Sequence, residues 1–492
     1  MRIINTIVSC VAALLGGVLG FGDDVVSIAA AQPIKPQHYP RTDSGNAELF
    51  ATLYGESVRF DHKRGRWLIW DEQSNRWCED TQAQVRGLMK ATARHRLQNS
   101  DALPEDRGYE FKWFLKSESR YGIDSALELA KSEPPISDSG EGWDNDPWLL
   151  RLADCMIDLR RGEARQATRL DRMTKSSPVA FDAEARCPRF EQFISEIFAG
   201  DEELTNFVRK AIGYSLTGSV REQCLFACYG DGRNGKSTLL EILLHLLGDY
   251  GIDLPFGALE AKRYGNTPGE GVNLPGARFA KVVEIREGRQ LDEARIKSWT
   301  GGDTMSVRPL YSNTFSFNPT HKLWLAFNHK PVISDDSPAM WRRIRMIPFL
   351  QKFEGAQKDP TLLEKLKAEA PGILNWAIEG CLRWQHEGLE APTAVAQATQ
   401  EYQAESDVLA SFLHDCCIIE AAASVTSAEL WSSYLSWADQ SGEPRFSRNA
   451  LADHLKKGRF MPDEEGHDKV RIWRGLRLRP PVAGVRADAG TD

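Results

Sequence analysis

The sequence predicts an α/β fold with a parallel sheet, because strand-like apolar runs alternate with helix-like runs through its centre. One apolar run, Gln223–Tyr229, leads through a glycine-rich segment into a helical pattern at Ser237–Leu247. Two later runs, Phe279–Val283 and His321–Phe327, are also of the buried-strand type, and polar residues follow both. The order of strand, glycine loop and helix is the main reason for the prediction.

The glycine-rich segment fits the P-loop pattern at Gly230, Gly235, Lys236 and Ser237. Glycines let backbone N–H groups turn inward around a phosphate, and the following helix adds the positive end of its dipole. The pattern predicts that Lys236 reaches the β- and γ-phosphates of ATP and that Ser237 gives its oxygen to Mg²⁺. A chance glycine turn is the alternative, and the flanking strand and helix argue against it. The predicted nucleotide-binding residues are Gly230, Asp231, Gly232, Arg233, Asn234, Gly235, Lys236, Ser237 and Thr238.

Two acidic residues, Glu284 and Glu287, follow the apolar run at 279–283 in the manner of a Walker B element. In such a site one carboxylate holds Mg²⁺ through water and another orients the attacking water. We favour this interpretation, with Glu284 as the metal residue, over a surface charge cluster. The sequence leaves open whether Glu284 does both jobs or shares them with Glu287.

Asn328 and the pair Arg342 and Arg343 complete the candidate catalytic set. An asparagine at a strand end can bond the γ-phosphate or the attacking water, although taken alone it favours an ordinary turn. Arginine stabilises charge on a transferring phosphoryl group, and a neighbouring subunit can supply it. A solvated basic turn is the alternative for the two arginines.

These elements together resemble superfamily 3 helicases, specifically the phage/plasmid primase-helicase family with a poxvirus-like N-terminal region. The resemblance covers most of the chain and rests on Gly230–Thr238, Glu284 with Glu287 and Gly288, Leu291–Lys297, Thr300–Asp303, Leu325–Pro331 and Trp341–Arg343. It implies an AAA+-like P-loop core in a hexameric ring that hydrolyses ATP to move along single-stranded DNA. It also implies that Arg342 or Arg343 acts in the ATP site of a neighbouring subunit.

The same family has a DNA-contacting hairpin between its Walker B strand and its asparagine strand. Here that interval contains Arg308 and Tyr311, flanked by Lys297 and Lys322. A basic side chain beside an aromatic one suits a phosphate contact with base stacking. The resemblance therefore makes Arg308 and Tyr311 candidate DNA contacts and Lys297 a weaker one, whereas the residues alone fit a surface loop equally well.

Composition limits the class of protein. The 492 residues are 42% hydrophobic and 26% charged, which is typical of a globular protein with two to four domains. A net charge of −8 excludes a globally basic nucleic-acid binder, so DNA must meet local basic patches or several subunits together. Nine scattered cysteines without a C-x-x-C pair indicate free thiols in a reducing cytoplasm.

The chain divides into segments of different character. Met1–Gly20 resembles a signal peptide, but Asp23 and Asp24 interrupt the approach to the alanines that would form its cleavage site. We interpret it as a helical remnant or a start-site artefact, and its apolar run is short for a membrane span. Residues 32–48 look like a linker. We expect an apolar leader and linker (1–40), a small α+β poxvirus-like domain (41–189), a helical linker or collar (190–222), the ATPase core (223–355), a helical region (356–420), a winged-helix DNA-binding domain (421–480) and a disordered tail (481–492).

The last folded segment has a local excess of positive charge. Residues 445–479 contain ten Arg or Lys against five Asp or Glu, so a basic recognition helix is one interpretation and a protein-contacting winged helix is the other.

The sequence thus favours a cytoplasmic, ATP-driven replicative DNA helicase that requires ATP and Mg²⁺, contacts single-stranded and duplex DNA, and assembles as a homo-oligomer. The alternative is an ATP-binding replication initiator or DNA scaffold without unwinding activity. A primase domain or zinc module often precedes this core in the family, and no matching pattern is present here. We therefore expect that this chain does not make primers by itself: either a separate chain is the priming partner, or the gene is a truncated prophage copy. We expect no membrane partner.

Overall fold

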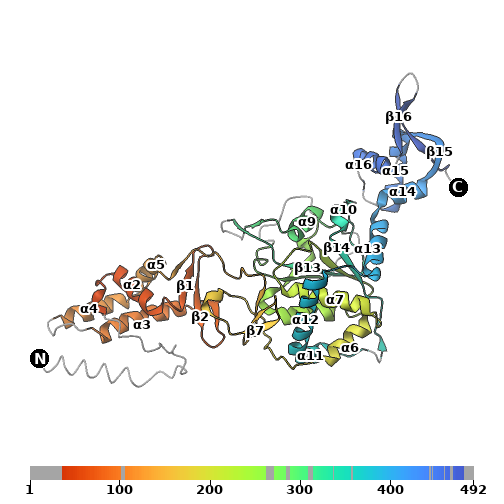
Figure 1. Ribbon diagram of the computed structural model, residues 1–492. Coiled ribbons are helices and arrows are strands. Elements are labelled where there is room, and N and C mark those ends of the chain that lie inside the picture. The colour runs from red at the N-terminus through yellow and green to blue at the C-terminus, as the bar shows by residue number, and fades with distance from the viewer. Residues whose placement is uncertain are drawn as a thin grey trace, which may run out of the picture. The chain divides into compact units, whose positions relative to one another are not determined.

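The computed structural model describes residues 36–100, 106–261, 271–283, 289–308, 314–335, 337–355, 358–442, 445, 447–458, 460–465 and 469–480. The chain forms two compact units, whose elements are labelled in Figure 1. The first extends to Asp144 and includes Ala167–Thr174; the second comprises Asn145–Gln166 and everything from Lys175 onward. Within the described residues, no helix has the length and apolar character that crossing a bilayer requires. Residues 1–35 of the predicted leader and linker (1–40) and the predicted tail (481–492) lie outside the described residues.

The first unit packs four helices against a small sheet. The helices are α2 (Asp43–Tyr54), α3 (Gln84–Gln98), α4 (Arg107–Ser117) and α5 (Arg120–Ala130), and the strands are β1 (Val58–Asp61), β2 (Arg66–Asp71), β3 (Arg76–Glu79) and β4 (Ser137–Asp138). The sheet order is β3-β2-β1-β4, antiparallel except for β1 with β4. Strands β1 and β2 thus lie on either side of a short turn, and α3 follows β3.

The predicted linker at 32–48 is wrong in its last part, because α2 already begins at Asp43. The Thr42 side chain accepts a hydrogen bond from the backbone N–H of Gly45 at 3.0 Å, which caps the helix. Its inward side chains, among them Leu49 and Phe50, are fully buried. A polar stretch therefore starts a helix that the unit's core holds in place.

The second unit is built on a five-stranded parallel sheet, which confirms the predicted α/β class. Its strands are β8 (Leu225–Tyr229), β9 (Gly251–Pro255), β10 (Phe279–Val283), β13 (Lys322–Phe327) and β14 (Ile344–Pro348). The order is β14-β8-β13-β10-β9, and all four pairings are parallel. The three central strands, β8, β13 and β10, are buried nearly throughout, as their continuous apolar runs predict.

Helices cover this sheet and extend the unit. They are α6 (Pro188–Ile197), α7 (Glu202–Leu216), α8 (Lys236–Leu247), α9 (Glu293–Gly301), α10 (Pro338–Trp341), α11 (Leu362–Ala368) and α12 (Ala370–Glu387). Helices α7 and α12 lie side by side (Figure 1) because two glycines permit a close approach. A Cβ on Gly213 would stand 2.0 Å from the Cys381 nitrogen, and one on Gly380 would stand 2.2 Å from the Arg209 oxygen. The helical linker or collar expected at 190–222 thus contains most of α6 and all of α7.

A small antiparallel sheet and a terminal module complete the second unit. The sheet consists of β5 (Leu149–Arg151), β6 (Met156–Asp158) and β7 (Glu163–Arg165). After α13 (Thr393–Ser406), the terminal module comprises α14 (Val408–Cys416), β15 (Cys417–Thr426), α15 (Ser427–Ser441), α16 (Arg448–Lys457), β16 (Met461–Glu465) and β17 (Val470–Leu478). Its strands pair antiparallel in the order β15-β17-β16 around a separate apolar core.

At the amino end of β13, His321 is buried without a hydrogen-bond partner for either ring nitrogen among the described residues. Its ring meets that of Trp299 edge-on at 5.9 Å. Burial, with a smaller effect of the neighbouring Lys322, lowers the pKa of His321 to about 3. The imidazole is therefore neutral in the folded protein at any moderate pH.

This burial predicts a pH-dependent stability. The unfolded chain takes up a proton on His321 below its ordinary pKa, whereas the folded chain does so only near pH 3. The stability is fully present above about pH 6.5 and falls as the pH is lowered toward 3. Lowering the pH from 7.5 to 5 should therefore reduce the free energy of unfolding of His321→Phe by about 2 kcal/mol less than that of the wild type. Urea unfolding of both proteins at the two pH values measures this, and equal losses would contradict it.

Candidate functional site

The register of the parallel sheet brings two predicted residues to one edge. Strand β8 ends at Tyr229 and continues into the glycine loop, while β13 ends at Phe327 and continues into Asn328. Phe327 pairs with Tyr229, so Asn328 and Gly230 follow the two strands side by side. The carboxyl edge of a parallel sheet is where open α/β folds bind ligands. The acidic residues predicted after β10, Glu284 and Glu287, lie outside the described residues.

The loop between β8 and α8 depends on two of its glycines. Gly230 has φ +148°, and a Cβ there would stand 2.2 Å from the Phe349 carbonyl oxygen. Gly235 has φ +90°, and its Cβ would stand 2.6 Å from Ile197. Around Gly232, by contrast, a Cβ would meet nothing within 4 Å. Packing and backbone shape therefore require glycine at the first and last positions only.

Asn234 ties this loop to the neighbouring strand. Its side chain is almost fully buried and donates a hydrogen bond to the Phe349 carbonyl at 3.0 Å. The Phe353 N–H donates in turn to the Arg233 carbonyl at 2.9 Å. The segment after β14 thus supports the loop from outside. The sequence suggested Asn234 only as one member of the glycine pattern, and this supporting role was missed.

The Lys236 ammonium lies inside the loop that precedes it. It donates hydrogen bonds to the carbonyls of Gly230 at 2.6 Å and Asp231 at 3.0 Å, and to the Asn234 amide oxygen at 3.0 Å. It also donates to the Asn328 amide oxygen at 3.1 Å. Burial lowers the pKa of Lys236, an effect that Cys228 and Asp231 partly oppose. The arrangement concentrates one desolvated positive charge at the sheet edge, where it can hold an anion.

Beside this ammonium lies the amino end of α8. The helix begins at Lys236, and its N-cap residue, Gly235, offers no side-chain hydrogen bond to the first N–H groups. Ser237 is exposed and Thr238 half-buried at this end. The N–H groups of the first turn, the helix dipole and the Ser237 hydroxyl are groups that can hold an anion and a hydroxyl-ligated Mg²⁺. The side chains present therefore fit ATP with Mg²⁺.

An ion-pair triad around the buried Lys281 holds α8 against the sheet. Lys281 on β10 contacts Glu241 of α8 at 2.6 Å and Asp253 of β9 at 2.7 Å. Burial alone would lower the pKa of Lys281, but the two carboxylates outweigh it and the pKa is raised. The triad fixes the helix whose first residue is Lys236.

The segment Asn328–Pro331 (Asn-His-Lys-Pro), which follows β13, contacts helix α13, which is distant in sequence. The Lys330 ammonium forms an ion pair with Glu405 of α13 at 2.6 Å and lies 4.8 Å from the Tyr229 ring centre. The Tyr402 hydroxyl of the same helix donates to the Pro331 carbonyl. This segment is part of the family resemblance, but the spacing of residues in the sequence does not reveal that Lys330 contacts α13.

The two candidate arginines lie at the opposite edge of the sheet from the loop. They precede β14, whose five residues run parallel to β8 from Ile344, opposite Leu225, to Pro348, opposite Tyr229. At about 3.3 Å per residue, this strand separates them from the loop by roughly 16 Å. Arg342 is exposed, whereas Arg343 is buried and donates to the Ala339 carbonyl. Neither guanidinium is brought to Lys236 of the same chain.

The hairpin expected between the second and third strands of the site is present. Strand β11 (Met305–Val307) pairs antiparallel with β12 (Phe315–Phe317), and the Ser306 and Ser316 hydroxyls are 2.8 Å apart. Arg308 directly follows β11, and Tyr311 lies outside the described residues. Lys297 on α9 forms an ion pair with Asp335. Lys322 is buried on β13, where its ammonium donates to the Thr217 and Ser219 carbonyls, so it does not flank the hairpin as a surface cation.

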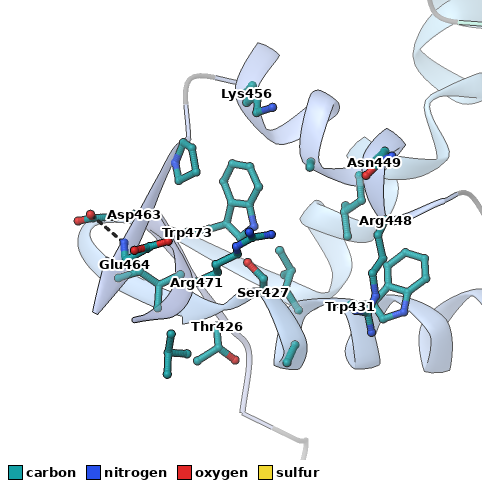
Figure 2. Close-up of a pocket in the computed structure, with 17 residues that line it drawn as sticks. Thr426, Ser427, Trp431, Arg448, Asn449, Lys456, Asp463, Glu464, Arg471 and Trp473 are labelled. Carbon is teal, nitrogen blue, oxygen red and sulfur yellow. Dashed lines mark hydrogen bonds between the residues drawn. The ribbon is translucent and has the colours of Figure 1, made fainter. Parts of the chain in front are cut away.

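The terminal module contains an open cavity of about 890 Å³. Figure 2 shows that it is bordered by Arg448 and Lys456 of α16, by Arg471 and Trp473 of β17, and by Trp431 of α15. Asp463 and Glu464 of β16 also line it, and Asp463 is paired with Arg474 at 2.5 Å. The cavity therefore combines three cations with aromatic walls beside the helix predicted to read DNA.

Two stretches of the chain match known families. Residues 47–199 match a family described as D5 N terminal like. Residues 228–343 match one described only as a family of unknown function, DUF5906. The first match covers the predicted poxvirus-like domain, and the second extends from β8 past the glycine loop and β13 to the two arginines.

Viral proteins named as putative helicases resemble part of the chain. One from Acanthamoeba polyphaga mimivirus is 30% identical over 234 residues, which are 44% of this chain and 24% of that protein. One from Frog virus 3 (isolate Goorha) is 25% identical over 268 residues, which are 50% of this chain and 27% of the relative. The matched region thus spans only about a quarter of each relative. In fold, the chain is similar to the apo NrS-1 C terminal region, with a TM-score of 0.50, 10% identity, and coverage of 87% of this chain and 99% of that one.

The two glycine environments predict opposite effects of the same substitution. Gly230→Ala forces a Cβ against the Phe349 carbonyl in a strained backbone, so the loop must shift and nucleotide affinity should fall at least tenfold. Gly232→Ala, in the same loop, has open space around it and should bind nucleotide within about twofold of the wild type. Titration with a fluorescent ATP analogue measures both variants. Equal affinities would show that the loop does not bind the nucleotide in this conformation.

Proposed function

We propose that this chain, a member of the D5-like helicase family, is an ATP-dependent DNA helicase that works as an oligomeric ring on single-stranded DNA. The observation that carries the proposal is the contact between the Lys236 ammonium and the Asn328 amide at 3.1 Å, made where two parallel strands end. This contact joins the cation that binds phosphate to the residue that can sense it. The similarity to viral proteins named as putative helicases supports a nucleic-acid substrate, and DNA is part of the proposal.

Each residue at the sheet edge has a defined task in this proposal. Lys236 leaves the carbonyls of Gly230 and Asp231 to neutralise the phosphates, and the amino end of α8 adds N–H donors. Ser237 supplies an oxygen to Mg²⁺, and Glu284 or Glu287 holds the metal and activates water. Asn328, released from Lys236, orients that water or the terminal phosphate. ATP supplies the free energy when its terminal phosphoryl group is hydrolysed.

The position of the arginines supports a site shared between subunits. Arg342 is exposed at the sheet edge opposite to its own glycine loop, and Arg343 is buried and engaged. Of the two, Arg342 is therefore the one free to enter the site of a neighbouring copy. A repeating head-to-tail contact of this kind closes into a ring when its rotation permits. Arginine in trans stabilises the charge that develops on the transferring phosphoryl group.

DNA contacts are proposed in two parts of the second unit. One part is the interval around the β11–β12 hairpin, where we propose Arg308 and Tyr311 as contacts and Lys297 of α9 as the weaker candidate. The terminal module has the helix and strand order of a winged helix, and Arg448, Lys456 and Arg471 line its cavity. We propose that this module binds duplex DNA, with α16 as the recognition helix.

Hydrolysis measured with and without single-stranded DNA tests the motor. We expect DNA to stimulate ATP hydrolysis by the wild type, and Lys236→Ala to lower the stimulated rate at least a hundredfold, because the phosphates lose their buried cation. Lys365→Ala, an exposed lysine on α11, is the matched control and should hydrolyse like the wild type. If the wild type binds ATP and DNA but DNA leaves hydrolysis unchanged, the chain is an initiator or scaffold instead.

Mixing two inactive variants tests the shared site. Lys236→Ala and Arg342→Ala should each lack hydrolysis. In a random one-to-one assembly, about a quarter of the interfaces join an intact Lys236 to an intact Arg342, so activity should return to roughly that fraction. Arg161→Ala, which removes an exposed arginine from the β6–β7 turn, should be active alone. If mixed oligomers form and no activity returns, Arg342 does not complete the site in trans.

A further inference from the structure

Helix α4 of the first unit exposes side chains that helices ordinarily bury. Tyr109 is 64% exposed, Phe111 46% and Leu115 55%. Two lysines on the same helix, Lys112 and Lys116, are also exposed. We call these five residues the α4 surface. It lies in the first unit, whereas the nucleotide site lies wholly in the second.

The five residues form adjacent stripes along the helix. Phe111 and Leu115 are four residues apart, as are Lys112 and Lys116, so each pair occupies one line along the helix axis. Tyr109 lies on the other side of the lysine line, and the Lys112 ammonium is 6.0 Å from its ring centre. The positive charges are therefore flanked by apolar rings on both sides.

Two acidic residues of the same stretch, Glu110 and Glu118, do not oppose this charge. Glu110 is buried and forms an ion pair with Arg41 at 2.6 Å. Glu118, just after the helix, forms one with Arg94 at 2.6 Å. Both carboxylates are thus neutralised by cations from other segments. The outward face of α4 carries a local positive charge on a chain whose net charge is −8.

We propose that the α4 surface binds single-stranded DNA, with Lys112 and Lys116 against phosphates and Tyr109 and Phe111 against bases. Alternating cations and exposed rings are the features by which proteins hold a single strand without reading its sequence. A second copy of this helix fits less well, because a two-fold contact would place the lysine pair against itself. The proposal rests on the proposed function for the identity of the strand as DNA.

The α4 surface and the nucleotide site lie in different units. The proposal therefore predicts that single-stranded DNA binds α4 in the absence of ATP. The α4 surface then holds the single strand independently of the hairpin and the terminal module. Substitutions on α4 are therefore expected to change DNA affinity and its salt dependence, while basal hydrolysis without DNA stays unchanged.

Photo-crosslinking with the full chain locates the contact directly. An oligothymidine containing 5-iododeoxyuridine is bound without nucleotide, irradiated and digested with trypsin. We expect crosslinks on Tyr109 or Phe111, in the peptide that follows Arg107 and ends at Lys112. This readout uses the wild-type protein, so it does not depend on a variant that must fold. Crosslinks confined to other segments would overturn the proposal.

Affinity measured against salt concentration gives an independent readout. Each lysine that contacts a phosphate contributes about 0.7 to the slope of log K against log salt, so Lys112→Ala and Lys116→Ala should each lower the slope by about that amount. Phe111→Ala should weaken binding about fivefold or more by loss of stacking. The matched controls are Lys90→Ala, an exposed lysine on α3, and Leu129→Ala, which is 42% exposed on α5. Equal slopes for Lys112→Ala and Lys90→Ala would overturn the proposal.

The same experiments separate this inference from the proposed function. If the wild type crosslinks at α4 but DNA does not stimulate hydrolysis, the DNA-binding role of α4 is supported and the helicase function is refuted. If DNA stimulates hydrolysis but the α4 variants match their controls, the helicase function is supported and the role of α4 is refuted. Loss of self-association or of binding to anionic vesicles in the α4 variants, without a DNA crosslink, would assign the surface to another partner and also overturn the proposal.

Discussion

The ammonium of Lys236 is the group on which the rest of the site depends. It is buried among the carbonyls of its own loop, and its fourth partner is Asn328 from another strand. That contact exists only because β8 and β13 are parallel neighbours in a register that ends them together. The Lys281 triad holds α8 and the Asn234 amide holds the loop, so both act by keeping this one charge in place.

The same sheet explains why one copy of the chain is insufficient for the proposed chemistry. Its carboxyl edge carries the proposed phosphate site and its amino edge carries the arginines, and a strand cannot fold back to join them. The proposed ring meets this constraint, because each subunit would turn its arginine edge toward the next subunit's loop. Helix α13 is bound to the Asn-His-Lys-Pro segment through Lys330 and Glu405, which connects the site to the start of the terminal module. A shift of Asn328 on hydrolysis would therefore also displace the segment that is bonded to α13.

Sequence reasoning predicted the parts of the fold that have strong local signals. The buried strands β8 and β13 are continuous apolar runs, and the glycine loop has a fixed spacing, so both were predictable. The Lys236–Asn328 contact was not, because an isolated asparagine after a strand favours a turn and only the sheet register brings it to the loop. Strand β16 escaped prediction since Met461–Glu465 is exposed and acidic, and pairing with β17 alone makes it a strand. The opposite position of Arg342 likewise follows from strand direction, which spacing does not reveal.

The central claim is that a charge at the sheet edge is coupled to movement along DNA. Displacement of a labelled strand from a tailed duplex by the purified chain tests this most directly, with tails of either polarity. The account predicts displacement that requires both ATP and Mg²⁺ on one of the two tails and is absent for Lys236→Ala. A wild-type chain that binds the tailed duplex and hydrolyses ATP, yet displaces no strand from either substrate, would contradict it.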